Sequence, residues 1–272
     1  MQNDDFGDRM KLYEAFEASR KLIPLLPICV RIDGKTFSKW TKDFDRPYDK
    51  RMADLMIATT KFLVEEVNAC VGYTQSDEIS LILYSNNIES QVFFNGKTHK
   101  ITSVIASMTT AFFNRAAEEF LPQDQAALAK RPLAFFDCRV WNVPTLEEAA
   151  NTILWREQDS TKNSISMAAQ SLFSHRQLQD KNGANMQEML FSKGINWNDY
   201  PDFFKRGTFI QRRKVFRLFT EEEKERVPEK FWPTEPIERN EIRVITMPKF
   251  SSVINRVGVI FNGEEPKTEG QK

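Results

Sequence analysis

Residues 72–84, GYTQSDEISLILY, place two adjacent carboxylates directly before an apolar strand. The residues on both sides of Ser76, Asp77 and Glu78 predict a strand–turn–strand hairpin over residues 70–84. A tight turn needs one polar residue, such as Asp or Ser, and does not need two carboxylates in succession. Either the chain simply turns here, or the turn holds a positively charged group.

The segments around this hairpin alternate between strand and helix patterns. The stretch ICVRID predicts a strand over residues 28–33 that ends at Asp33, and LAFFDCRVWNV predicts another over 133–143. Apolar stripes at helical spacing predict helices over residues 49–68 and 100–120. The order strand, helix, strand, strand, helix, strand is that of the ferredoxin-like β-α-β-β-α-β fold. The sequence therefore predicts an α+β fold, in which an antiparallel sheet carries both helices on one face.

The chain divides into two regions that we expect to pack as one structural unit. Residues 1–144 hold the core, with a helix predicted over 7–21, and residues 145–272 form a C-terminal extension. Within the extension the patterns predict a long helix over 145–180, a short helix over 186–191, a basic hairpin over 203–219 turning at Arg206-Gly207, a charged loop over 221–230, a last strand over 241–247 and a frayed tail from Asn262.

Composition argues against several classes of protein. The 272 residues include 38 basic and 38 acidic ones, so any nucleic-acid surface must come from local charge asymmetry. Cys29, Cys70 and Cys138 lie far apart and form no zinc-binding spacing with the two histidines. The chain has no GxSxG motif, which argues against a Ser-His-Asp hydrolase. The start of the chain is no signal peptide and no apolar run is long enough for a membrane span, so we expect a cytoplasmic protein.

Asp33 and Asp77 fall at matching ends of strands that are neighbours in the predicted fold. Two close carboxylates repel each other, and divalent cations remove that repulsion. Magnesium is typically held by one or two carboxylates plus substrate phosphates, and two such ions about 4 Å apart stabilise both oxygens of a phosphoryl displacement. Gly34 has no Cβ, so a phosphate or metal can approach its backbone. The alternative is that Asp33-Gly34 and Ser76-Asp77 are two ordinary turns; Glu78 either supports the site or is a solvated strand residue.

Other phosphate-binding machinery is absent from the sequence, because it contains neither GxxxxGK[ST] nor GxGxxG. A triphosphate would have to be held by side chains and metal. The candidates are Lys35, Arg46, Lys97 and Lys100, of which the last two lie near a predicted helix start that favours anions. Each of these residues also fits the simpler interpretation of an exposed basic side chain.

Several motifs, taken together, closely resemble the tRNA-His guanylyltransferase family. They are RIDGKTF at 31–37, YTQSDEISLIL at 73–83, FDCRV at 136–140, WREQDSTKNS at 155–164, EMLFSKGINWNDYP at 188–201 and KRGTFI at 205–210. The resemblance spans most of residues 7–213. It implies a polymerase palm-like catalytic core that adds nucleotides in the reverse, 3′-to-5′ direction. ATP or GTP first activates the 5′-monophosphate of a tRNA, and the 3′-hydroxyl of an incoming nucleoside triphosphate then attacks the activated end.

The resemblance also implies roles for individual residues. Two magnesium ions would be held by Asp33, the Gly34 carbonyl and Asp77, with Ser76 and Glu78 beside them. Nucleotides would be bound by Lys35, Phe37, Arg46, Ser76, Lys97 and Lys100, of which Lys97 and Lys100 belong to a basic stretch that binds a second triphosphate. The family usually assembles as a homotetramer that grips one tRNA across its subunits.

Residues that contact tRNA are expected in the extension. The stretch 205–217 holds six basic residues with Phe209 and Phe216 between them, so it supplies charge for RNA phosphates. We take Asn163, Lys205, Arg206, Arg212 and Arg213 as candidate tRNA contacts. A strand with one solvated basic face explains the same run equally well.

One departure from the family concerns substrate choice. Eukaryotic members carry His-Ile-Asn-Asn after the Trp-Arg pair, and this chain has Thr161-Lys162-Asn163-Ser164. Asn163 is kept and the histidine is lost, which puts strict selection of tRNA-His in doubt. The chain more closely resembles the "-like" branch that repairs 5′-truncated tRNAs, although guanylate addition to tRNA-His stays open. Two other functions also stay open, namely a palm-fold nucleotidyl cyclase and a non-catalytic RNA-binding module.

Overall fold

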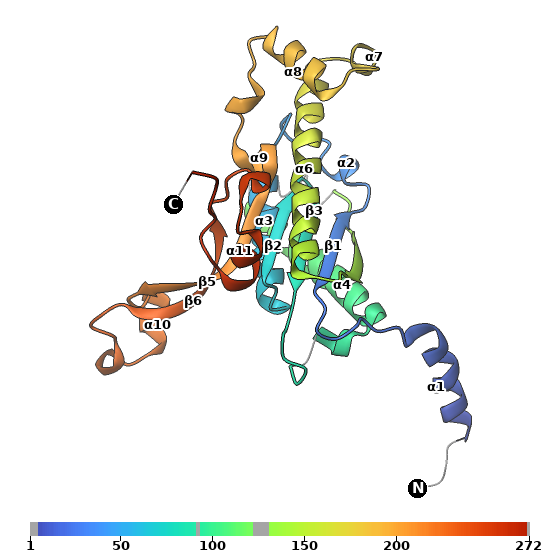
Figure 1. Ribbon diagram of the computed structural model, residues 1–272, viewed down its shortest axis with the longest axis vertical. Helices are drawn as coiled ribbons and strands as arrows, with labels where there is room; N and C mark the ends of the chain where they lie inside the picture. The colour runs from blue at the N-terminus through green and yellow to red at the C-terminus, as the bar shows by residue number, and fades with distance from the viewer. Residues whose placement is uncertain (1–4, 91–92, 122–130, 271–272) are drawn as a thin grey trace.

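A six-stranded antiparallel sheet forms the centre of the computed structural model, which describes residues 5–90, 93–121 and 131–270 (Figure 1). The strand order is β4-β1-β3-β2-β5-β6. Its first four members reproduce the predicted ferredoxin-like arrangement, and two further strands extend the sheet beyond β2. The strands are β1 (Ile28–Gly34), β2 (Val71–Gln75), β3 (Glu78–Leu83), β4 (Phe136–Asn142), β5 (Thr208–Arg217) and β6 (Ile237–Ile245).

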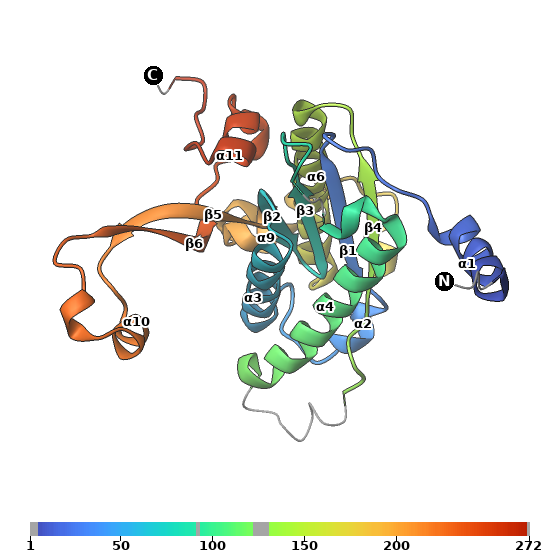
Figure 2. The same cartoon turned by 90° about the horizontal axis from the view of Figure 1, so that it is seen from below.

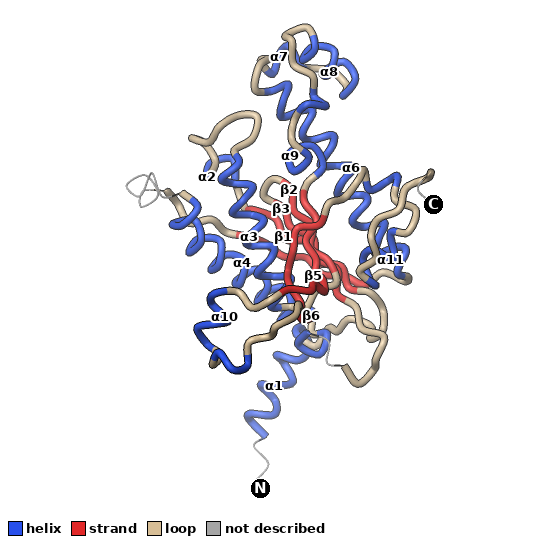
Figure 3. Tube along the Cα trace, turned by 90° about the vertical axis from the view of Figure 1, so that its left-hand side faces the viewer, coloured by secondary structure: helices blue, strands red, loops and turns tan. Residues whose placement is uncertain are grey.

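Two helices cover one face of the sheet, as predicted for the core (Figure 3). They are α3 (Lys50–Glu66) and α4 (Thr98–Phe120). The Asp49 side chain accepts a hydrogen bond from the Arg51 amide and so caps α3. The buried stripe of α3, which includes Leu55 and Leu63, packs with Ile32 of β1 in the larger hydrophobic core.

The opposite face of the sheet is covered by the C-terminal region. Here α6 (Leu146–Gln170) and α11 (Arg256–Asn262) pack on a second core that includes Tyr73 and Ile82 (Figure 3). Because both faces are covered, all six residues of β3 are buried. This explains why the sequence after Asp77 is a nearly continuous apolar run.

The basic hairpin predicted over 203–219 is wrong. Residues Asp202–Arg206 form the short helix α9, and β5 then runs straight from Thr208 to Arg217. The strand that pairs with β5 is β6, and α10 (Glu221–Arg226), capped by Thr220, lies in the connection that was expected to be a loop. Gly207, with a φ of 76°, ends α9 and does not close a hairpin. We call the β5–β6 ribbon with α10 the arm, which projects from the sheet (Figure 2).

The remaining elements lie at the periphery. Helix α1 (Asp5–Ala18) buries no residue and extends away from the sheet (Figure 1). The tail expected to fray from Asn262 is instead bonded, because Thr268 forms a bridge with Val253. No helix in the described part of the chain is long and apolar enough to cross a membrane. The other short elements are α2 (Phe37–Trp40), η1 (Phe93–Gly96), α7 (His175–Leu178), α8 (Gly183–Phe191), η3 (Trp197–Asp199), η4 (Glu229–Phe231) and η5 (Phe250–Ser252).

Gly207 provides a test of how α9 joins the sheet. A Cβ at this position would lie 2.5 Å from the Tyr73 hydroxyl and 2.7 Å from the Thr74 carbonyl oxygen. Since the positive φ adds strain of its own, we expect Gly207→Ala to lower the free energy of unfolding by about 2–3 kcal/mol. Chemical denaturation measures this change. Gly183→Ala is the matched control, because a Cβ there meets no atom within 4 Å, and it should leave stability unchanged or slightly raised.

Candidate active site

The strand order brings Asp33 to the turn between β2 and β3. Asp33 is the register partner of Glu78, and the Gly34 amide donates a hydrogen bond of 3.2 Å to the Asp77 carbonyl oxygen. Ser76 adopts a left-handed conformation with a φ of 49°, which allows a turn of two residues. Its hydroxyl donates to Asp77 Oδ1 at 3.1 Å. The structure thus places the two carboxylates predicted for metal binding at one end of the sheet.

The electrostatics of this end of the sheet favour a cation. Burial, together with the neighbouring Asp33 carboxylate, raises the pKa of Asp77 above its ordinary value. Among the described residues, neither Asp33 nor Asp77 forms an ion pair with a Lys or Arg side chain. No cluster of three or more His, Cys, Asp or Glu ligands occurs in that part of the chain either. The residues fit magnesium, which needs one or two carboxylates and completes its shell with water and substrate phosphates.

Gly34 is required by packing as well as by its place beside Asp33. A Cβ at Gly34 would lie 2.3 Å from the ring of Phe37. Phe37 is buried against Trp40 and Phe113, so its ring has no space into which it can move. The backbone at Gly34 therefore stays uncovered by a side chain of its own.

Glu78 is buried and paired, so the interpretation of a solvated strand residue is wrong. Arg156 of α6 donates from Nε to Glu78 Oε1 at 2.5 Å and from Nη2 to Oε2 at 2.8 Å. Burial raises the pKa of Glu78, and the Arg156 guanidinium counteracts that rise. Sequence analysis assigns no role to Arg156, although this residue belongs to the WREQ motif. The pair fixes α6 to the first residue after the carboxylate turn.

An apolar pocket of about 360 Å³ opens on the α3 side of the turn. Its wall includes three predicted nucleotide-binding residues, Phe37, Arg46 and Ser76, together with Asp77. Aromatic and methionine side chains that the sequence analysis did not assign complete it, namely Phe44, Tyr48, Met52, Met56, Met167, Phe203 and Phe204. A flat apolar ligand of nucleobase size fits such a pocket.

A second pocket, of about 290 Å³, lies on the α6 side of the same turn. Asp33, Asp77 and Glu78 form its floor, and it is lined by polar side chains from α6 and β2. These include the predicted tRNA contact Asn163; the others are Gln75, Ser166 and Gln170. The turn thus separates an apolar pocket from a polar one, and Asp77 borders both.

The predicted triphosphate ligands divide into two groups. Lys35 follows Gly34 directly and is exposed, and Arg46 lies at the apolar pocket, where it donates to the Thr41 carbonyl oxygen at 3.3 Å. Lys97 and Lys100 lie at the start of α4. Further along the same helix, the Thr110 hydroxyl accepts a hydrogen bond from the first residue of β4, which is paired with Gly34. Lys97 and Thr110 are thirteen positions apart along this helix, a distance of about 20 Å. Within one chain, the structure does not bring these two lysines to the carboxylates.

Three of the four basic tRNA candidates already have partners within the chain. Lys205 is buried and donates to the Asn198 carbonyl oxygen at 2.6 Å, and Arg206 pairs with Asp202 at 2.7 Å. Arg213 donates to the carbonyl oxygen of Gly263 in the C-terminal tail. Arg212, half-buried on β5, is the candidate for which no such partner exists among the described residues. Their contact with RNA stays a prediction.

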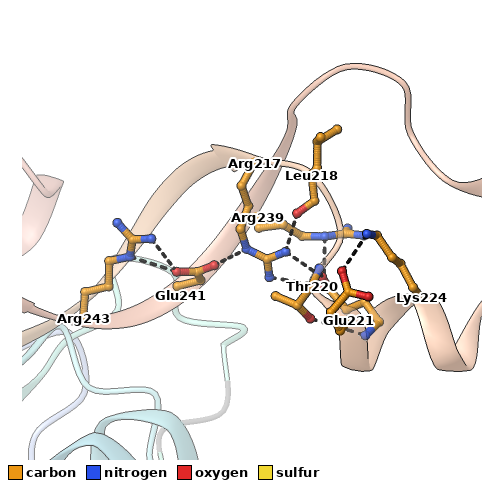
Figure 4. A network of polar contacts seen from close by, with 9 residues as sticks. Arg217, Leu218, Thr220, Glu221, Lys224, Arg239, Glu241 and Arg243 are labelled. Carbon is orange, nitrogen blue, oxygen red and sulfur yellow. Dashed lines mark hydrogen bonds and ion pairs between the residues drawn. The ribbon is translucent and has the colours of Figure 1, made fainter.

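The rest of the arm is also internally paired (Figure 4). Arg217 donates to Glu223 at 2.5 Å and to Glu241, which in turn accepts from Arg243 at 2.8 Å. The hydrogen bond from Arg217 lowers the pKa of Glu223 to about 2. Much of the basic charge that the sequence suggested for RNA therefore balances acidic residues of the same ribbon.

Comparison with known proteins points to a single family. A family model described as tRNAHis guanylyltransferase matches residues 7–144. The tRNA(His) guanylyltransferase of Saccharomyces cerevisiae is 29% identical over 228 residues, which cover 78% of this chain and 92% of the yeast protein. A bacterial tRNA(His) guanylyltransferase-like protein solved in complex with ATP is 36% identical, with a TM-score of 0.78 over 94% of this chain and 99% of that one. Another such structure, in complex with GTP, is 34% identical with a TM-score of 0.69, over 91% and 94% of the two chains.

Proposed function

This chain belongs to the tRNA(His) guanylyltransferase family and is a nucleotidyltransferase, and we propose that it adds nucleotides to the 5′ end of tRNA in the 3′-to-5′ direction. The observation that carries this proposal is the meeting of Asp33 and Asp77 between two pockets of different chemistry. A transfer reaction needs two substrates to meet at one phosphoryl group. The turn that holds Asp77 borders both pockets, and so do Gln75 of β2 and Met167 of α6.

Asp33, Asp77 and the Gly34 carbonyl would hold magnesium. When bound, two such ions supply charge stabilisation to the attacking and leaving oxygens of phosphoryl transfer. The chain's own contribution is to keep the two carboxylates adjacent and without a competing cation. The third carboxylate, Glu78, is treated differently. Arg156 neutralises it, so the Glu78 charge does not add to the repulsion between Asp33 and Asp77.

The apolar pocket would hold the base of ATP or GTP, between Phe37, Tyr48 and Phe204. The triphosphate would then extend past Arg46 and Lys35 toward Asp77. Support comes from the bacterial relatives, whose structures were solved with ATP and with GTP. Such positioning is most of what phosphoryl transfer needs from a protein.

The polar pocket would receive the 5′ end of the tRNA. Its monophosphate would be activated by ATP or GTP, forming a 5′-nucleotidylylated end with release of pyrophosphate. The 3′-hydroxyl of the incoming nucleoside triphosphate would then attack that end and release the nucleoside monophosphate. Asn163 and Gln170 of α6 supply hydrogen-bonding groups for the RNA terminus.

Thr161 supports repair of truncated tRNAs over strict selection of tRNA-His. Its hydroxyl donates to the Glu157 carbonyl oxygen at 3.1 Å, within α6 itself. A hydroxyl whose proton is bonded to its own helix has no proton left to donate to a nucleotide. This chain therefore lacks at position 161 the imidazole that the eukaryotic motif provides.

A homotetramer would complete the site. Lys97 and Lys100 lie at the far end of α4 and can serve a triphosphate at the carboxylates if a second subunit presents them. Helix α1 ends close to the start of α4, where Arg20 and Lys21 bond to Thr98 and Lys97, and its Phe16 is 85% exposed, so it provides a surface that a second subunit would bury.

Nucleotide addition in magnesium tests the function. The protein is incubated with ATP, labelled GTP and one of two 5′-monophosphorylated tRNAs: tRNA-His lacking its extra guanylate, or a non-His tRNA lacking its first nucleotide with a cytidine opposite the gap. We expect label on the truncated tRNA, because base pairing with the cytidine selects guanylate without help from residue 161. Label on tRNA-His alone would contradict repair. No label on either RNA, with cyclic nucleotide formed instead, would contradict the proposal as a whole.

A further inference from the structure

Three side chains beside the carboxylates take no part in the reaction described above. Arg31 of β1 and Arg139 of β4 are register partners, so both leave the sheet on the α6 face. The Arg31 guanidinium carbon lies 5.7 Å from the centre of the Trp155 ring on α6. We call Arg31, Arg139 and Trp155 the Arg–Trp patch.

The two arginines of this patch are poorly neutralised. Like charges on directly paired residues of neighbouring strands repel each other. Arg139 has Asp137 at 3.3 Å, but both side chains are more than half exposed, so the pair is weak. Arg31 Nε is buried without a hydrogen-bond partner among the described residues, and its charge acts on Glu78 from a distance. An anion between the two guanidiniums would remove the repulsion.

The patch also presents an aromatic surface to solvent. Trp155 is 45% exposed, and its ring centre lies 5.7 Å from the Arg31 guanidinium carbon and 4.5 Å from that of Arg156. A large exposed ring beside guanidinium groups is the combination on which proteins stack unpaired bases while holding backbone phosphates. Free nucleotide has its own apolar pocket on the other side of the Asp77 turn, so the patch suits a different ligand.

Its position relative to Asp33 indicates which ligand that is. Arg31 precedes Asp33 by two residues on the same face of β1, about 7 Å along the strand. A tRNA whose 5′ terminus lies at Asp33 must also place the opposing, unpaired end of its acceptor stem on a neighbouring surface. The patch offers such a surface on the α6 side, where the polar pocket also opens.

We propose that the Arg–Trp patch binds the unpaired nucleotides of the RNA substrate that lie beside its 5′ end, on the strand opposite the shortened terminus. One base stacks on Trp155, and one backbone phosphate lies between Arg31 and Arg139. This inference rests on the proposed function, since it takes the RNA terminus to lie at Asp33.

The test is binding of a 5′-monophosphorylated tRNA, measured by fluorescence anisotropy over a series of salt concentrations. Arg139→Gln should reduce the slope of log K against log salt by about one, as expected for one lost phosphate contact. Trp155→Leu should weaken binding about tenfold with little change in that slope, and Trp155→Phe should recover much of the loss. ATP binding should stay at the wild-type level in all three variants.

Arg115→Gln is the matched control. Arg115 is also an exposed arginine over an aromatic ring, 5.5 Å from the centre of Phe112, but it belongs to α4 on the other face of the sheet. It should leave RNA affinity and salt slope unchanged. Wild-type RNA affinity and slope in both Arg139→Gln and Trp155→Leu would overturn the patch alone. A wild-type protein that neither binds tRNA nor adds nucleotides would overturn the proposed function, and this inference with it.

Discussion

Asp77→Asn should abolish nucleotide addition, with a loss of roughly a thousandfold or more. The substitution keeps the size of the side chain and removes the charge that borders both pockets. It also ends the repulsion with Asp33, which contributes to the raised pKa of Asp77. Folding stability without metal should therefore be unchanged or slightly higher. Single-turnover addition assays and thermal unfolding measure the two effects.

If Asp77 binds magnesium, Asp77→Asn should also change how much magnesium and ATP stabilise the folded protein. Magnesium with ATP should raise the unfolding temperature of the wild-type protein, because a ligand that binds the native state stabilises it. Asp77→Asn should lose most of this rise. Asp54→Asn is the control, since Asp54 pairs with Lys50 on α3 and lines neither pocket. An Asp77→Asn protein that keeps near wild-type addition rates would show that the carboxylates do not hold the metal.

Arg156→Met should be the most destabilising substitution near the site. Arg156 and Glu78 have side chains only 8% and 10% exposed, so removing the guanidinium leaves a buried carboxylate without its partner. Breaking a buried pair in this way costs about 3–5 kcal/mol. Addition should also fall steeply, because the negative charge then lies uncompensated beside Asp33. Denaturant titration and addition assays check both expectations.

A double substitution separates charge from packing in this pair. Glu78→Gln combined with Arg156→Met removes both charges, so it should recover much of the stability lost in Arg156→Met. Activity should stay low in the double variant if Glu78 itself acts in the reaction. Stability losses that simply add would show that the two residues do not act as a unit.

The core of the fold was predictable because its signals are local. The alternation at 28–33, the helical stripe of α3 and the apolar run after Asp77 each indicate one element, and their order leaves few topologies. The meeting of Asp33 with the turn at Ser76 follows from that order alone. For the same reason the carboxylate pair could be named before its geometry was known.

The features missed depend on contacts between distant residues. Glu78 and Arg156 are 78 positions apart, and nothing near either residue indicates the other. Arg206-Gly207 resembles a turn, so the sequence predicts β5 as half of a local hairpin, whereas its partner β6 begins at Ile237. The apolar pocket was missed because Phe203 and Phe204 come from a helix that reaches Tyr48 only in the folded chain.

The two-sided burial of the sheet has a consequence for the order of synthesis. When a ribosome has released only the first half of the chain, β1 to β4 can pair, but the face with Tyr73 and Ile82 has no cover. The outer edge of β2 also stays unpaired until Thr208–Ile210 of β5 have been synthesised. A nascent chain that stops near residue 144 thus exposes an apolar face and an open strand edge, both of which promote aggregation. We expect the catalytic core to require its C-terminal region simply to stay soluble during translation.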